Sequence, residues 1–102
     1  MKQHTYEATL THIADAQGNP STYTDTLSFN SYNHDDIFNV LQVSQNSQIL
    51  DDEATKSFAV GLKLFSEVML EHKELPLFKD FMPQFGQFMK ALKQTVKTQK
   101  QG

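Results

Sequence analysis

The sequence predicts an α+β fold, in which an N-terminal antiparallel β-hairpin packs against three or four C-terminal helices. Apolar and polar residues alternate in two stretches of the first 32 residues, which is the period of a strand with one buried face. From about residue 34 onward, apolar residues recur at the three- and four-residue steps of a helix. With 102 residues, the chain is expected to form a single domain over residues 1–102 without covalent cross-links.

The hairpin is predicted to occupy about residues 3–32. In its first strand Tyr6 and Leu10 face the core, and the neighbouring threonines face solvent. A loop with Gly18 and Pro20 then reverses the chain, because glycine accepts a positive φ angle and proline disfavours a helical residue before it. The open edges of a two-stranded sheet can pair with another chain, so we expect a homodimer in which hairpins meet edge to edge or helical faces pack.

Four helical segments are expected after the hairpin, at about residues 34–45, 51–73, 76–81 and 83–98. Asn33 is positioned to cap the first segment, and Asp51 opens the longest one with two more acids behind it. Pro76 and Pro83 each suit the first turn of a helix but not its interior, so they separate the last two segments.

The central helix, about residues 51–73, is the element around which the domain is expected to be organised. Its apolar face is unusually wide, which predicts contact with more than one neighbour. The line that widens this face consists of Val60, Leu64 and Val68. Lys63 and Glu67 lie four residues apart, and we expect them to form an exposed ion pair; the alternative is that they border a contact surface.

Composition limits the possible functions. The absence of cysteine excludes disulfides, thiolate metal ligands and cysteine nucleophiles. The net charge is −3, but residues 1–74 carry −7 and residues 75–102 carry +4. All basic residues are lysines, and the lack of arginine argues against nucleic-acid recognition. Without a secretion signal or an apolar stretch long enough to span a membrane, the protein is expected to be soluble and cytoplasmic, with no membrane contact.

Five segments carry a resemblance to a known family, and they are Asn33–Asp36, Leu50–Ala54, Gly61–Lys73, Pro76–Phe78 and Phe88–Lys90. Together they resemble the bacterial domain-of-unknown-function family numbered 3861. The resemblance covers nearly the whole chain and is most specific between Gly61 and Phe78. It implies a small bacterial protein that consists of this domain alone. The family brings no activity, cofactor or partner, so the resemblance implies no functional residue.

Two groups of histidine and carboxylate residues are the candidate metal or small-ligand sites. They are His34, Asp35 and Asp36 at the start of the first helix, and Glu67, Glu71 and His72 on the central helix. Such side chains suit zinc, manganese or iron if the groups meet in space. However, Glu71 and His72 are adjacent, and Glu67 lies five residues from His72, so neither pair has the helical spacing that brings ligands together. Helix capping and dipole complementation are therefore favoured, and we expect no metal and no cofactor.

The C-terminal segments supply the candidate interaction surface, which consists of Phe81, Met82, Phe85, Lys90, Lys93 and Lys97. Large apolar residues are more frequent here than one short helix needs to cover a hairpin. The surplus can close the core, or it can form a dimer contact or a groove for a partner peptide. The lysines can bind nucleic acid or an acidic partner, but Phe85 is predicted to face inward rather than to stack on bases, which favours an ordinary solvated face.

The sequence has no cysteine nucleophile, no serine in a glycine-flanked elbow and no phosphate-binding glycine loop. We therefore expect a non-enzymatic protein-interaction module, which forms a homodimer or binds another protein. The alternatives are a small-ligand or divalent-metal binding protein that uses the histidine and carboxylate groups and, as a third interpretation, a lysine-mediated nucleic-acid binder.

Overall fold

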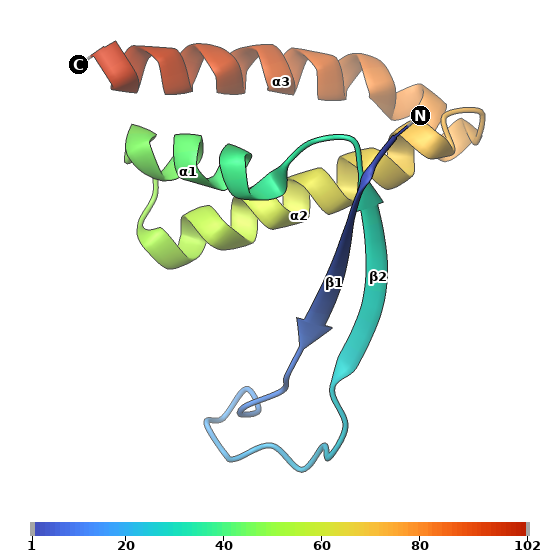
Figure 1. Cartoon of the computed structure of the whole chain (residues 1–102), viewed down its shortest axis with the longest axis vertical. Helices are drawn as coiled ribbons and strands as arrows, with labels where there is room; N and C mark the ends of the chain where they lie inside the picture. The colour runs from blue at the N-terminus through green and yellow to red at the C-terminus, as the bar shows by residue number, and fades with distance from the viewer. Residues whose placement is uncertain (1, 102) are drawn as a thin grey trace. The chain divides into compact units, whose positions relative to one another are not determined.

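The structure is a computed structural model that describes residues 2–101, with side chains described for residues 2–98. Its elements are, in chain order, β1 (His4–Leu10), β2 (Leu27–Asn33), α1 (Ile37–Ser47), α2 (Asp52–Glu71) and α3 (Pro76–Gln101), as Figure 1 shows. A hairpin followed by three helices confirms the predicted α+β class. The chain divides into a hairpin unit, Met1–His34, and a helical unit, Asp35–Gly102. No helix within the described residues is both long and apolar enough to cross a membrane.

The hairpin unit contains a two-stranded antiparallel sheet. Its register pairs Leu10 with Leu27 and continues residue by residue to the other end of both strands. Next to this pair, the hydroxyl oxygens of Thr9 and Ser28 are 3.1 Å apart and form a cross-strand hydrogen bond. Both strands are shorter than the alternating stretches of the sequence that predicted them, because the connection between them forms a turn with its own hydrogen bonds.

That connection, residues 11–26, folds back on itself. Asp15 Oδ1 accepts hydrogen bonds from the backbone N–H groups of Gln17 at 2.9 Å and Asn19 at 2.8 Å. Gly18 takes a φ angle of 87°, which confirms the predicted positive φ at this glycine. The hydrogen bonds, with that from the Asn19 backbone as the main cause, lower the pKa of Asp15 below its ordinary value of 3.8. A turn with internal hydrogen bonds competes with extension of the sheet, so the strands end early.

An aspartate side chain sets the start of α1. Asp36 Oδ1 accepts hydrogen bonds from the backbone N–H groups of Phe38 at 3.1 Å and Asn39 at 3.3 Å. The predicted cap at Asn33 is wrong, because Asp36 satisfies these N–H groups from a position directly before the helix. The helix consequently begins at Ile37 rather than at residue 34.

The start of α2 follows the prediction. Asp51 caps it, because its Oδ1 accepts a hydrogen bond from the backbone N–H of Ala54 at 2.8 Å. The helix ends at Glu71, slightly before the predicted residue 73, and the following His72 takes a non-helical backbone conformation.

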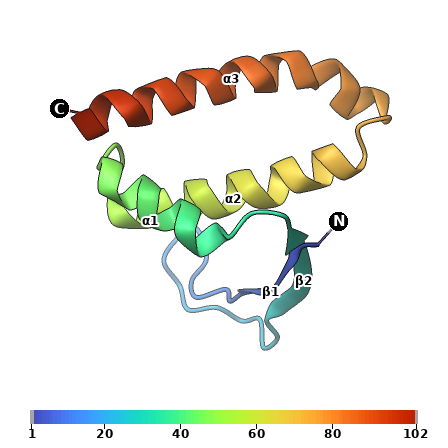
Figure 2. The ribbon, with the colours of Figure 1, turned by 45° about the horizontal axis from the view of Figure 1, so that its top comes forward.

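The last part of the chain forms one helix, α3, although the sequence predicted two segments at residues 76–81 and 83–98. Pro83 lies inside this helix, where its missing N–H leaves the carbonyl four residues earlier without its usual donor. Phe81 and Phe85 flank the proline, and the ring centroids of both lie 6.4 Å from that of Phe65 in α2. Because both halves pack on the same ring, they remain on one bowed axis, which Figure 2 shows. The predicted break is therefore wrong.

Two kinds of contact hold the helical unit together. Helix α1 lies against both α2 and α3, and a layer of phenylalanine rings joins α2 to α3. In this layer the Phe58 and Phe88 centroids are 6.3 Å apart and nearly edge to face. Among the described residues, the buried apolar side chains are Ile37, Ala59 and Met69. Much of the apolar surface predicted to form the core is consequently accessible to solvent.

Replacing Asp36 with alanine removes the acceptor for two N–H groups at the start of α1. We expect the free energy of unfolding to fall by about 1 kcal/mol. Chemical denaturation followed by circular dichroism measures this change. Asp36→Asn is the matched control, since asparagine caps about as well as aspartate. Equal losses in the two variants would contradict the capping role.

Candidate functional site

An ion pair joins the segment before α1 to α2. Lys63 Nζ lies 2.7 Å from Asp35 Oδ2, and the two side chains are 18% and 35% exposed. The sequence predicted Lys63 and Glu67 on a solvated helix face, but Glu67 is only 6% exposed, so that interpretation is wrong. No side-chain oxygen or nitrogen that is fully buried within residues 2–98 lacks a hydrogen-bond partner. These charged side chains therefore belong to the packing of α2 rather than to its solvated surface.

The histidine and carboxylate candidates can be described one by one. They are His34, Asp35, Asp36, Glu67, Glu71 and His72. Asp36 caps α1, Asp35 binds Lys63, and His34 is the last residue of the hairpin unit. Glu71 and His72 lie exposed at the C-terminal end of α2, where the His72 backbone N–H caps the helix. In the part of the chain that the structure describes, no three histidine, aspartate or glutamate side chains gather closely enough to hold a metal ion.

Charged side chains at the start of α2 interact at the surface. Lys56 Nζ lies 2.9 Å from Asp52 Oδ2, and this hydrogen bond lowers the pKa of Asp52 from 3.8 and raises the pKa of Lys56 from 10.5. Gln45 Nε2 also donates to Asp52 Oδ1 at 2.8 Å, which adds a contact from α1. Because the pKa of Asp52 is lowered, its contribution to stability is present above the ordinary aspartate pKa and is lost as pH falls through the lowered value. Both side chains are more than half exposed, so this contribution is small.

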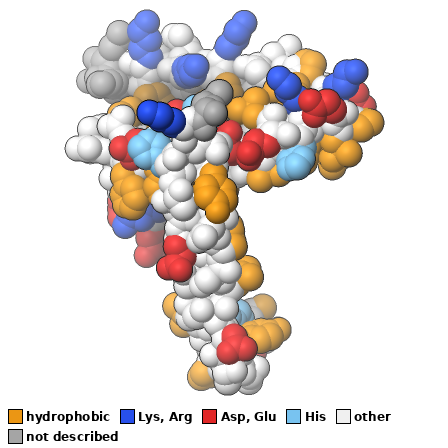
Figure 3. Space-filling view, turned by 45° about the vertical axis from the view of Figure 1, so that its right-hand side comes forward, with side chains coloured by type: hydrophobic (Ala, Val, Ile, Leu, Met, Phe, Trp, Pro, Cys, Tyr) orange, Lys and Arg blue, Asp and Glu red, His pale blue; other side chains and the backbone are white. Residues whose placement is uncertain are grey.

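A groove of about 420 Å³ runs between α1 and α3. Its apolar floor comes from Val40 and Val43 on α1 and from Leu92 and Val96 on α3. Its remaining lining includes Lys93 and Lys97, and we call the whole feature the lysine groove. The two lysines lie four residues apart on α3, so they lie on the same side of the helix. Figure 3 shows lysine side chains along α3, at the top of that view.

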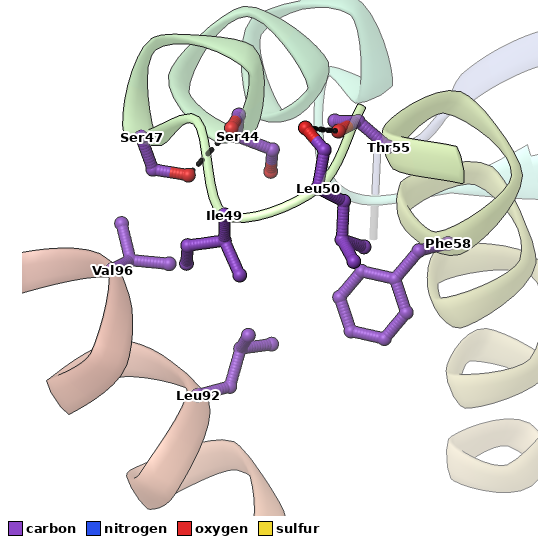
Figure 4. A pocket seen from close by; sticks show the side chains of 8 residues that line it. All are labelled: Ser44, Ser47, Ile49, Leu50, Thr55, Phe58, Leu92 and Val96. Atoms are coloured by element: carbon purple, nitrogen blue, oxygen red, sulfur yellow. Dashed lines mark hydrogen bonds between the residues drawn. The ribbon is translucent and has the colours of Figure 1, made fainter. Parts of the chain in front are cut away.

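A smaller cavity of about 40 Å³ adjoins the lysine groove. Figure 4 shows Ile49, Leu92 and Val96 pointing toward one another across it, with Phe58 at its other side. Leu92 and Val96 line both spaces, so the cavity and the groove lie next to each other at the α1 and α3 contact. The side chains between these helices thus leave space that an additional apolar group can fill.

A second apolar surface lies on α2. It consists of Val60, Gly61, Leu64, Phe65 and Val68, and we call it the α2 face. Val60 is 37%, Phe65 45% and Val68 49% exposed, and Leu64 is partly buried. The sequence identified the Val60, Leu64 and Val68 line as widening the apolar surface of this helix, and Val60 and Val68 of this line are exposed to solvent.

The predicted interaction residues of α3 divide between the contact with α2, the lysine groove and the exposed surface of α3. Phe81 is 41% exposed, whereas Met82 and Phe85 are half-buried. Phe81 and Phe85 contact Phe65, so they connect α3 to the edge of the α2 face. The predicted residues Lys93 and Lys97 line the lysine groove. Lys90 is exposed elsewhere on α3.

Sequence reasoning missed the α1 side of the lysine groove. The groove depends on Val40 and Val43 meeting Leu92 and Val96, about 50 residues further along the chain. A helix pattern identifies an apolar side chain but not the helix against which it packs. The only sequence signal for this surface was therefore the lysine row of α3.

A double-mutant cycle on the Lys63 and Asp35 ion pair measures its contribution to folding. We expect Lys63→Met and Asp35→Asn to show a coupling energy of about 1 kcal/mol at low salt, because both charges are partly buried. The coupling should decrease as salt screens the pair. The exposed pair of Asp52 and Lys56 is the matched control and should show weaker coupling. Coupling as weak as that of the control would contradict a structural role for the Lys63 pair.

Comparisons with known proteins identify the family. Residues 4–94 match the model of a family described as a domain of unknown function with a solved structure, DUF3861. A crystal structure of a protein of unknown function from Pectobacterium atrosepticum (eca1910) is similar, with 38% sequence identity and a TM-score of 0.77. The similarity covers 91% of this chain and 99% of that one. A search of curated proteins found no match. The chain therefore belongs to the DUF3861 family.

Proposed function

We propose that this protein is a non-enzymatic protein-interaction module that binds an acidic, amphipathic helical segment of a partner protein in the lysine groove. The observation that carries this proposal is the combination of an apolar floor and a lysine border in one groove between two helices. A helix that binds in such a groove buries one apolar stripe and keeps its polar residues at the border.

The size of the lysine groove supports this kind of ligand. Its volume of about 420 Å³ lies within the range of about 300–1,000 Å³ typical of binding sites. The floor is shared between α1 and α3, so a helix laid along it contacts both. The adjoining cavity at Ile49 and Leu92 offers space for one larger apolar side chain of the partner.

The charge of the groove favours an acidic partner. Lys93 and Lys97 bring two positive charges to its lining, and no acidic residue is among the described lining residues. The surrounding segment, residues 75–102, carries a formal charge of +4. Complementary charge speeds association and selects partners more than it increases affinity. We therefore assign affinity to the apolar floor and selectivity to the lysines.

The chemistry of the groove supports binding rather than catalysis. Its described lining contains asparagine, valine, serine, leucine and lysine side chains, without a histidine or carboxylate that can act as a general base. The one lining hydroxyl, on Ser44, donates to the Val40 carbonyl at 2.9 Å and is therefore engaged by its own helix. A serine held in this way, without a neighbouring base, is not an activated nucleophile.

A synthetic amphipathic peptide tests the proposal. The probe carries leucines at helical spacing and glutamates on both sides of that stripe, and its binding to the full chain is measured by calorimetry and amide chemical shifts. We expect the double variant Lys93→Glu, Lys97→Glu to bind the peptide about tenfold more weakly, or about 1.4 kcal/mol. Val43→Asp should also weaken binding, because it places a charge on the apolar floor.

The double variant Lys79→Glu, Lys90→Glu is the matched control, since it makes the same charge change on α3 outside the lysine groove. Equal losses in the two double variants would reduce the interaction to a general charge effect and contradict the proposal. Binding of duplex DNA with a steep salt dependence, without binding of the acidic peptide, would instead favour the nucleic-acid alternative.

A further inference from the structure

The geometry points to the α2 face as a homodimer interface, in which α2 of one copy packs against α2 of a second copy, with Gly61 at the closest approach of the two helices. This inference concerns a different surface from the lysine groove, and the two can succeed or fail separately.

The exposed apolar side chains of α2 support a second copy. Val60, Phe65 and Val68 are 37%, 45% and 49% exposed. Contact with the same patch of a second copy removes this apolar surface from water, which favours association. The lysine groove lies between α1 and α3 and stays free for another partner.

The α2 face is suited to meet a copy of itself. In a two-fold symmetric dimer, the same patch lies on both sides of the interface. A charged residue near the axis therefore lies against the same residue of the other copy, and the two repel each other unless they are paired. The side chains of the α2 face are valine, glycine, leucine and phenylalanine, and none is charged. The lysine groove has the opposite property, because a copy of it would bring lysines against lysines. Charge therefore directs a second copy to α2 and an acidic partner to α3.

Gly61 indicates where the helices approach most closely. It lies in the middle of α2, where glycine is less favourable than alanine because it loses more conformational freedom on folding. Nothing within the chain requires it, since a Cβ atom at this position would meet no atom within 4 Å. Exposed Val60, Phe65 and Val68 surround it. A glycine framed by open apolar side chains allows a second helix to approach more closely than larger residues permit.

Gly86 provides an internal comparison. It also lies inside a helix, and a Cβ atom there would also meet no atom within 4 Å. Its neighbours on the surface of α3 are different, because Lys79, Lys90 and Lys93 lie seven, four and seven residues away. The charged setting of Gly86 does not suit a two-fold contact. The same substitution at the two glycines therefore separates interface effects from general helix effects.

The first experiment compares the masses of wild type, Gly61→Leu and Gly86→Leu by sedimentation equilibrium at micromolar concentrations. Wild type and Gly86→Leu should have twice the chain mass of 11.6 kDa. Gly61→Leu should be monomeric, with dimer affinity reduced about 30-fold or more. Its helix content should be retained, because leucine is a better helix former and its Cβ atom meets no atom within 4 Å.

The second experiment tests the two-fold geometry with opposite charges at one position. Val60→Lys and Val60→Glu should each be monomeric alone, because Val60 adjoins Gly61 and each variant therefore places like charges close to the axis. An equimolar mixture should restore the dimer mass. Gly61→Leu should meanwhile bind the acidic peptide as wild type does, since it leaves the lysine groove unchanged.

Three results would overturn the inference. A wild-type protein that remains monomeric at the highest soluble concentration has no such interface. A dimer that survives both Gly61→Leu and the single charged variants at Val60 uses another surface, such as the open edges of the hairpin. Dissociation by Gly86→Leu as readily as by Gly61→Leu would remove the specific role of α2.

Discussion

Phe65 is the ring on which the packing of the helical unit depends. Its centroid lies 6.4 Å from the centroids of Phe78, Phe81 and Phe85, all on α3. Ring pairs of this kind contribute about 0.5–1.5 kcal/mol beyond the burial of their area. Because the rings lie on both sides of Pro83, they hold together a helix that the proline would otherwise interrupt. Rings of this size also separate α2 from α3. Helix α1 contacts both of these helices, and the lysine groove forms where α1 meets α3.

The two apolar surfaces of the helical unit differ mainly in charge. The α2 face is neutral, and the lysine groove is positive. Under the two proposals, this difference gives each surface a different class of partner, because an uncharged patch tolerates its own copy and a positive groove attracts acidic residues. The uneven charge along the sequence, negative before residue 75 and positive after it, has the same effect at the level of the whole chain. A small domain can in this way separate self-association from partner binding without a cofactor or a catalytic group.

Local features of the sequence were predictable, and features that depend on distant contacts were not. The cap at Asp51 and the order of strands and helices follow from patterns within a few residues of each other. Pro83 was misread because the rings that stabilise the helix around it belong partly to α2. The exposed setting predicted for Lys63 and Glu67 was wrong for the same reason, since Asp35, which binds Lys63, lies 28 residues away in the sequence. The lysines of the lysine groove were predicted from the sequence as part of a candidate surface. The part of the floor that α1 supplies was not, because it depends on which helices pack together.

The scarcity of buried apolar side chains has a consequence for the behaviour of the protein in the cell. Within residues 2–98, the buried apolar positions are Ile37, Ala59 and Met69, which is a small core for a chain of this length. A protein with so little internal packing gains much of its stability by mass action when a second copy binds the folded form but not the unfolded one. Its folded fraction then rises with its own concentration. Under the dimer model, newly made chains are most exposed to proteases when expression is low, so the level of synthesis itself sets the lifetime of the protein.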